Sequence, residues 1–247
     1  KTYDTVFNIE HFRSAGYAVG RFQELLSDYP AATLYETIPD FHNTVKRYEN
    51  FIKAVEMDSC NRAAGVKDEI DFVIKRSEET KIIINLLAKG DLPLSVTHND
   101  TKFNNVMIDD ESGRGICLID LDTVMPGSTL YDFGDSIRSG ANPAAEDEKD
   151  LSKVCLELSL YEKFTQGYLE AARTFLKPAE LENLPLGAKL MTFECGIRFL
   201  TDYLSGDTYF KIHRPEHNLD RARTQFKMVA DMENKWDKMH QIVNRYK

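Results

Sequence analysis

The stretch that decides the fold is His98-Asn99-Asp100-Thr101-Lys102-Phe103-Asn104-Asn105. It follows a short β-rich segment, Leu94–Thr97, and leads directly into another, Asn105–Asp109. A third such segment covers Gly115–Asp120. A purely structural hairpin needs few polar side chains, yet amides and carboxylates are dense here. The segment is therefore the candidate for the chemistry of the protein.

The last two β-rich segments predict a hairpin, because the polar, glycine-containing run 110–114 between them has the length of a turn. If the hairpin is symmetric about positions 112 and 113, Asn105 faces Asp120 and Ile108 faces Cys117. An amide oxygen and a carboxylate then meet at one end of the ladder, five residues beyond Asp100. One carboxylate acting as a base, beside two oxygen ligands for a hard cation, is what phosphoryl transfer requires.

The rest of the chain has helical periodicity. Apolar residues recur at steps of three and four through the first two-fifths, and Gly90 stands where a glycine ends a helix. Pro178 suits the first turn of a helix. The pattern predicts an α+β protein, mostly helical, with helices over 12–26, 40–52, 62–87, 130–139, 151–176, 178–205 and 216–245.

Composition excludes several classes of protein. The chain has 247 residues, a formal net charge of −9 and 42% hydrophobic residues, which suits a folded domain with a real core. No apolar run is long enough to span a membrane, and no basic cluster suggests nucleic acid as a partner. The cysteines, which show no C-x-x-C pair, are expected to be reduced core thiols. We expect a cytoplasmic protein.

The motif H-x-D-x-x-x-x-N, followed by a hairpin and a hydrophobic-hydrophobic-Asp, resembles the catalytic core of the protein-kinase-like superfamily, and most closely its aminoglycoside phosphotransferase branch. The longer text of His98–Asn105, Ile119–Gly127 and Leu130–Asp135 is similar specifically to the N-acetylhexosamine 1-kinases. That resemblance extends from about Tyr3 to the end of the chain. It implies the C-terminal lobe of a protein-kinase-like fold.

The resemblance assigns roles to individual residues. It implies that Asp100 accepts the proton of the attacking hydroxyl and that Lys102 lies near the transferred phosphoryl group. It implies two ligands for Mg²⁺ beside the phosphates of ATP, Asn105 and Asp120. His98 is expected to organise the loop by packing and hydrogen bonding.

A second carboxylate competes for the metal. Asp132-Phe133-Gly134 spells the kinase metal motif, but it follows a loop with Pro126-Gly127, where we expect no strand and no alignment with Asn105. We therefore prefer Asp120 and expect Asp132 to cap a helix or support the catalytic loop. Asp122 stays open between a second metal contact and a structural hydrogen bond.

Substrate recognition rests on fewer signals. Glu194, Arg198 and Asp202 step by four along a predicted helix, which also fits a solvated ladder of salt bridges. The resemblance to hexosamine kinases implies sugar contacts from Arg198 and Tyr209, with planar donors from the first and an apolar face from the second. Three polar neighbours fit either the same pocket or a surface loop: His213, Arg214 and Asn218.

The parts of a nucleotide-binding lobe are not recognisable in the sequence. No glycine-rich loop between strands and no strand lysine precedes the helical region, and the chain begins with Lys1 rather than Met. Residues 1–247 are therefore expected to be a C-terminal catalytic and substrate-binding lobe alone, without its ATP lobe, and inactive by itself.

The expected function is that of the parent enzyme: transfer of phosphate from ATP to the anomeric hydroxyl of an N-acetylhexosamine, with Mg²⁺. One alternative is a kinase of the same superfamily for another small alcohol, such as an aminoglycoside, choline or homoserine. A strongly acidic pocket would favour these cations, whereas Arg198 in the pocket would oppose them. Another alternative is a small-molecule-binding domain without catalysis, although such a domain has no need of a base and two metal ligands.

Overall fold

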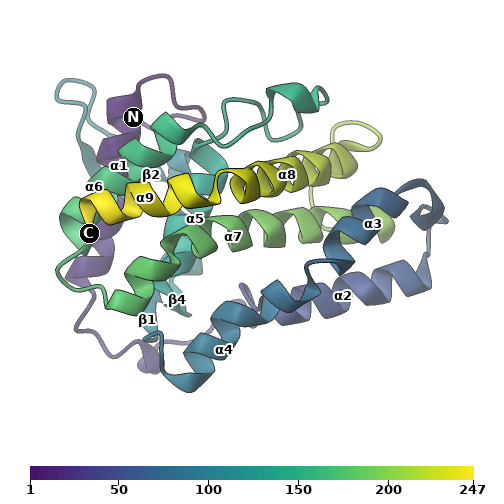
Figure 1. Cartoon of the computed structure of the whole chain (residues 1–247), viewed down its shortest axis with the longest axis horizontal. Helices are drawn as coiled ribbons and strands as arrows, with labels where there is room; N and C mark the ends of the chain where they lie inside the picture. The colour runs from purple at the N-terminus through teal and green to yellow at the C-terminus, as the bar shows by residue number, and fades with distance from the viewer.

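The computed structural model describes all residues from Lys1 to Lys247. The chain is a mostly helical α+β protein, as the sequence predicts (Figure 1). Its nine helices are α1 (Ile9–Leu25), α2 (Thr44–Met57), α3 (Lys67–Ile74), α4 (Ile82–Lys89), α5 (Thr129–Gly140), α6 (Leu158–Ala172), α7 (Pro178–Leu204), α8 (His217–Asn234) and α9 (Trp236–Tyr246). Gly90 ends α4 with a φ of 77°, and Pro178 begins α7, so both predicted helix boundaries are confirmed.

Two of the predicted helices are wrong because each is two shorter helices in the structure. The segment 62–87 is interrupted by the polar turn Ser77–Lys81. Arg76 holds this corner, since its guanidinium donates to both carboxylate oxygens of Glu233, at 2.9 and 2.7 Å. The segment 216–245 breaks at Lys235, whose ammonium group donates to Leu156 O at 2.9 Å. Apolar periodicity continues across such corners, so the pattern alone does not reveal them. The helix expected over 151–176 is likewise shorter, because α6 begins only at Leu158.

The strands form two small antiparallel pairs. β1 (Ser95–Thr97) pairs with β4 (Met125–Gly127), and β2 (Val106–Ile108) pairs with β3 (Gly115–Leu118). The expectation that no strand lies at Pro126-Gly127 is therefore wrong: the short β4 leads directly into α5 and anchors its start beside β1.

The predicted hairpin is present, but the predicted register is wrong by one residue. Met107, not Ile108, pairs with Cys117, and the Asn105 carbonyl accepts from Ile119 N at 2.9 Å. The turn is not symmetric, because the backbone N–H of Asp109 donates to the Arg114 carbonyl. The Asp109 carboxylate also accepts from the Ser112 amide at 2.9 Å. The ladder is also irregular between Met107 and Ile108. Asp120 consequently lies one residue beyond the partner of Asn105.

One continuous core joins the helices. α1 lies against α6, and at their crossing a Cβ on Gly16 would come within 2.3 Å of the Phe164 carbonyl oxygen, so this close approach requires glycine. α7 crosses the middle of the molecule and contacts both α5 and α8 (Figure 1). The small strand pairs lie beside α1 and α5, so the segment His98–Asn105 between β1 and β2 lies against the core.

The thiols only partly follow expectation. None of the four cysteines is paired, but Cys60 and Cys117 are exposed rather than part of the core. Cys117 lies in β3, where Ile116 and Cys117 are both exposed. None of the helices is both long and apolar enough to cross a bilayer.

Candidate active site

The loop His98–Asn105, the candidate catalytic loop, is held by a buried carboxylate. Asp132, in the first turn of α5, is fully buried and accepts from the backbone N–H of His98 at 3.0 Å and of Asn99 at 2.7 Å. The Gln23 side chain donates to it at 2.9 Å. Burial raises the pKa of Asp132, and the two backbone donors oppose that rise. Ser128, not Asp132, caps α5. Both oxygens of Asp132 accept hydrogen bonds from the protein, so this carboxylate supports the loop.

His98 fixes the peptide groups around Asp100. The ring is fully buried, and its Nε2 donates to Ile119 O at 2.9 Å while its Nδ1 accepts from Asp100 N at 3.3 Å. Thr123 Oγ1 donates to the His98 carbonyl at 2.7 Å. The ring thus links the loop His98–Asn105 to the residue that follows β3.

Asp100 uses one carboxylate oxygen for support and leaves the other without a partner in the chain. Its Oδ2 accepts from Asn105 Nδ2 at 3.0 Å and lies 2.9 Å from Lys102 Nζ. Its Oδ1 has no hydrogen-bond partner in the chain, and the side chain is 25% exposed. A half-buried carboxylate with one free oxygen is suited to accept a proton from a bound hydroxyl.

The two residues expected to bind metal have the right donors. Asn105 directs its amide nitrogen to Asp100, which leaves its Oδ1 without a partner in the chain. Asp120 is exposed, makes no ion pair and has a φ of 64°. A non-glycine residue held in this sparsely populated region is typical of functional sites. Free amide and carboxylate oxygens fit a hard cation such as Mg²⁺, although no cluster of three or more His, Cys, Asp or Glu side chains is present.

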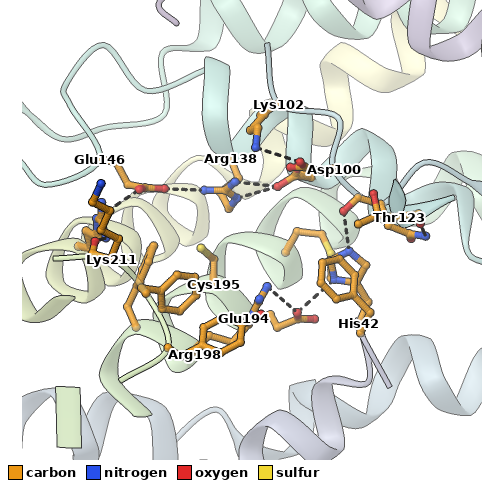
Figure 2. Close-up of a pocket in the computed structure, with 18 of the residues that line it drawn as sticks. His42, Asp100, Lys102, Thr123, Arg138, Glu146, Glu194, Cys195, Arg198 and Lys211 are labelled. Atoms are coloured by element: carbon orange, nitrogen blue, oxygen red, sulfur yellow. Dashed lines mark hydrogen bonds and ion pairs between the residues drawn. The ribbon is translucent and has the colours of Figure 1, made fainter. Parts of the chain in front are cut away.

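A cavity of about 480 Å³ opens beside the catalytic loop (Figure 2). It brings together residues that are about a hundred positions apart in the chain: Asp100 and Lys102 on one side, Arg198 and Tyr209 on the other. The catalytic candidates and the substrate-binding candidates therefore face one common space.

Arg198 lies within a group of aromatic rings. Its guanidinium carbon is 5.3 Å from the ring centroid of Phe41, 5.9 Å from that of Tyr209 and 5.5 Å from that of Phe210. These distances are within the range of cation–π attraction. The positive charge of Arg198 thus occupies the aromatic surface of the cavity.

The residues that step by four do not form a solvated ladder. Glu194 is 2% exposed, and Arg198 lies 4.0 Å from its carboxylate. Asp202 is buried and accepts from the backbone N–H groups of Thr208 and Tyr209 at 2.9 and 2.8 Å, and from Phe210 N at 2.9 Å. Asp202 therefore shapes the loop that carries Tyr209.

The three polar neighbours of this loop separate. His213 lines the cavity. Arg214 turns away and pairs with Asp147 and Asp220, and the buried Asn218 donates to Asp202 at 2.9 Å. Only His213 contributes to the pocket wall.

Sequence reasoning missed several residues that line the cavity. His42 contacts Glu194, and Arg138 lies between Asp135 at 2.8 Å and Glu146 at 3.1 Å (Figure 2). The acidic connection 140–150 carries Glu146, which forms part of the wall. None of these residues belongs to a local motif, so only the three-dimensional arrangement reveals them.

The charge of the cavity is mixed. Its carboxylates are Asp100, Asp135, Glu146 and Glu194, and its strong cations are Lys102, Arg138, Arg198, Lys211 and Arg221. The cavity is therefore not strongly acidic. Cys195 also lines it, and burial raises the pKa of this thiol to about 12.

Several solved structures share the fold of this chain. Solved structures with a similar fold include a microcompartment-associated aminopropanol kinase (16% identity, TM-score 0.52, covering 94% of this chain and 64% of that chain). They also include an ethanolamine kinase of Plasmodium vivax (14% identity, TM-score 0.56, covering 91% of this chain and 62% of that chain). A third is a choline kinase of Cryptosporidium parvum Iowa II (13% identity, TM-score 0.51, covering 95% of this chain and 69% of that chain). The chain thus spans less than two thirds of the length of the first two.

The family model of the phosphotransferase enzymes matches residues 1–178, more than half of the chain. This match includes the catalytic loop, the hairpin and Asp132. The chain belongs to the phosphotransferase enzyme family.

Proposed function

We propose that this chain is the catalytic and acceptor-binding lobe of a small-molecule kinase that uses ATP and Mg²⁺. The observation that carries the proposal is the common cavity of Asp100 with Arg198 and Tyr209. A base and an acceptor-binding wall that face one space are what transfer to a bound alcohol needs.

Asp100 acts as the general base in this proposal. Its free Oδ1 takes the proton of the acceptor hydroxyl while the hydroxyl oxygen forms a bond to the γ-phosphorus of ATP. The bond from that phosphorus to the bridging oxygen breaks, and ADP leaves. Lys102, 2.9 Å from Asp100 Oδ2, is near enough to stabilise negative charge on the transferred group.

Asn105 and Asp120 would hold Mg²⁺, since both carry oxygen atoms that are free of protein partners. The ion supplies positive charge against the phosphates when it is bound. Asp132 is not proposed as a ligand, because its oxygens already accept three hydrogen bonds from the protein.

The acceptor that we propose is a neutral sugar, an N-acetylhexosamine phosphorylated at its anomeric hydroxyl. Arg198 offers donors for hydroxyl and acetamide oxygens, and Tyr209 offers an apolar ring face. The charge of Arg198 already occupies the aromatic surface of Phe41, Tyr209 and Phe210. A substrate ammonium group placed there would meet a like charge.

The second candidate acceptor is an amino alcohol. The similar solved structures favour it, since they are an aminopropanol kinase, an ethanolamine kinase and a choline kinase. The buried carboxylate of Glu194 also suits a cation. Arg198 opposes this candidate, because it lies close to both Glu194 and the aromatic rings.

We further propose that residues 1–247 form one lobe and that the ATP lobe is contributed by other sequence. This proposal is supported by the lack of a recognisable phosphate-covering loop and by the share of the similar kinases that the chain spans.

Isothermal titration calorimetry on the 247-residue chain separates the acceptors. N-acetylglucosamine or N-acetylgalactosamine is expected to release or take up heat with a saturable isotherm, whereas choline and ethanolamine are not. Saturable binding of choline without binding of either sugar would replace the proposed acceptor with the amino alcohol.

A further inference from the structure

His42 joins the acceptor-binding wall to the catalytic loop. It precedes α2, and its side chain is 9% exposed in the cavity wall. Its Nδ1 lies 3.1 Å from Glu194 Oε1 on α7, and its Nε2 lies 3.2 Å from the Asn99 carbonyl oxygen. Figure 2 shows the ring beside Glu194.

Both partners of the ring accept hydrogen bonds and neither donates one. A neutral imidazole carries one N–H group, so it satisfies only one of these acceptors. The imidazolium form carries two N–H groups and satisfies both. The geometry therefore indicates a charged ring between the Glu194 carboxylate and the Asn99 carbonyl.

The Asn99 carbonyl belongs to the peptide group that leads into Asp100. Asn99 has a φ of 66°, so its backbone needs external support. Asp132 holds its N–H, and Thr97 and Thr123 hold its side chain. His42 is the group that holds its carbonyl oxygen, so it bears directly on the orientation of the base.

The groups around the ring decide its charge. Glu194 and Arg198 face it from α7, and Asp135 and Tyr131 face it from α5. Burial lowers the pKa of His42, but the carboxylates of Glu194 and Asp135 outweigh burial and leave that pKa above its ordinary value. The Tyr131 hydroxyl stays neutral, since burial raises its pKa.

We propose that His42, as an imidazolium ion, is a positioning residue that couples the acceptor-binding wall to the catalytic base, an inference that rests on the proposed function. Only the charged ring holds both Glu194 and the Asn99 carbonyl. The coupling is therefore complete below the ordinary pKa of histidine, and it is lost as pH rises through the raised pKa of His42 in the folded protein. Phosphoryl transfer should then lose turnover on the alkaline side as His42 deprotonates.

NMR titration of the imidazole nitrogens in the chain tests the charge without any assay of activity. His42 is expected to stay doubly protonated above the pH at which the exposed ring of a control histidine loses its proton. Glu194→Gln is expected to lower the pKa of His42. A neutral His42 ring throughout the neutral range would overturn the inference, even if the protein phosphorylates sugars.

Kinetics of the complete protein test the positioning role. His42→Gln is expected to lower kcat about tenfold, with KM changed less than about twofold, and to remove the alkaline limb of the kcat profile that follows the NMR titration. Glu194→Gln is expected to move that limb to lower pH, which guards against a misfolded His42 variant. His240→Gln, on α9 beside Trp236, is the matched control and should leave kcat unchanged.

The outcomes separate the two proposals. An unchanged alkaline limb in His42→Gln would overturn the positioning role. A charged His42 in a complete protein that phosphorylates no alcohol would instead overturn the proposed function.

Discussion

The loop His98–Asn105 and the loop that carries Tyr209 are each held by a buried aspartate, yet the two regions differ in the side chains that they place in the cavity. A buried aspartate accepts backbone N–H groups under each: Asp132 under His98 and Asn99, and Asp202 under Thr208, Tyr209 and Phe210. Each carboxylate converts a polar loop into a fixed one without leaving buried donors unpaired.

The difference lies in what each loop presents. The catalytic loop presents a base, a lysine and an amide from eight consecutive residues. The opposite wall is assembled from the segment before α2, from α7 and from the loop after α7. Its Arg198 is surrounded by rings from the first and the last of these segments. The candidate catalytic residues are therefore local in sequence, whereas the acceptor-binding wall depends on how distant elements pack.

Asp100→Asn should have the largest effect and should act on the catalytic side alone. Loss of the base is expected to lower kcat of the complete protein on the order of 10²- to 10⁴-fold. Sugar binding by calorimetry should stay within about twofold, because the wall of Arg198 and Tyr209 is untouched. Asp91→Asn, at an exposed position just after α4 and away from the cavity, is the control. Undiminished turnover in Asp100→Asn would remove the base assignment.

The two supporting aspartates should be comparably important for stability but should differ in function. Asp132→Asn and Asp202→Asn each leave buried N–H donors facing an amide, which is expected to cost roughly 3 kcal/mol of unfolding free energy. Urea unfolding measures this loss.

Among the molecules that remain folded, Asp132→Asn should lower kcat, and Asp202→Asn should weaken sugar binding with kcat largely retained. If both variants changed the same kinetic parameter, the separation of the two regions would be wrong.

Arg198→Met should change which acceptor binds. Removal of a charged donor is expected to weaken N-acetylhexosamine binding by about 2 kcal/mol, roughly thirtyfold. The rings of Phe41, Tyr209 and Phe210 would then be open to a cation, so choline should bind more tightly than to the natural chain. Calorimetry with both ligands measures the exchange. Tighter sugar binding by this variant would contradict the role given to Arg198.

Alkylation should have the smallest effect. Cys117, exposed on the catalytic hairpin, is expected to react with iodoacetamide at pH 8, whereas Cys195 in the cavity should stay unmodified because burial raises its pKa to about 12. Mass spectrometry of peptides identifies the modified thiols, and sugar binding should be unchanged. Modification of Cys195 before Cys117 would show that the cavity wall is more open than described.

Much of the catalytic side follows from sequence, because one contiguous motif specifies it. The predicted hairpin and the start of α7 at Pro178 are both present in the structure. The register was off by one residue, since the Asp109 and Ser112 contacts make the turn asymmetric. The sequence does not predict the strand β4, because a proline and a glycine within three residues are typical of a loop.

The acceptor side is less accessible to sequence reasoning. Arg198 and Tyr209 were expected through a family resemblance, but no pattern pointed to His42 or Arg138. The spacing of Glu194, Arg198 and Asp202 fits a solvated salt-bridge ladder as well as a binding wall. Only the burial of Glu194 and Asp202 distinguishes the two interpretations. Long-range packing, rather than local preference, places these side chains.

The most direct test of the central claim is a phosphoryl-acceptor screen on the complete protein, with the position of the new phosphate read by phosphorus NMR. We expect N-acetylglucosamine or N-acetylgalactosamine to gain a phosphate on its anomeric oxygen, and Asp100→Asn to give no product. A phosphorylated amino alcohol, with both sugars unchanged, would contradict it.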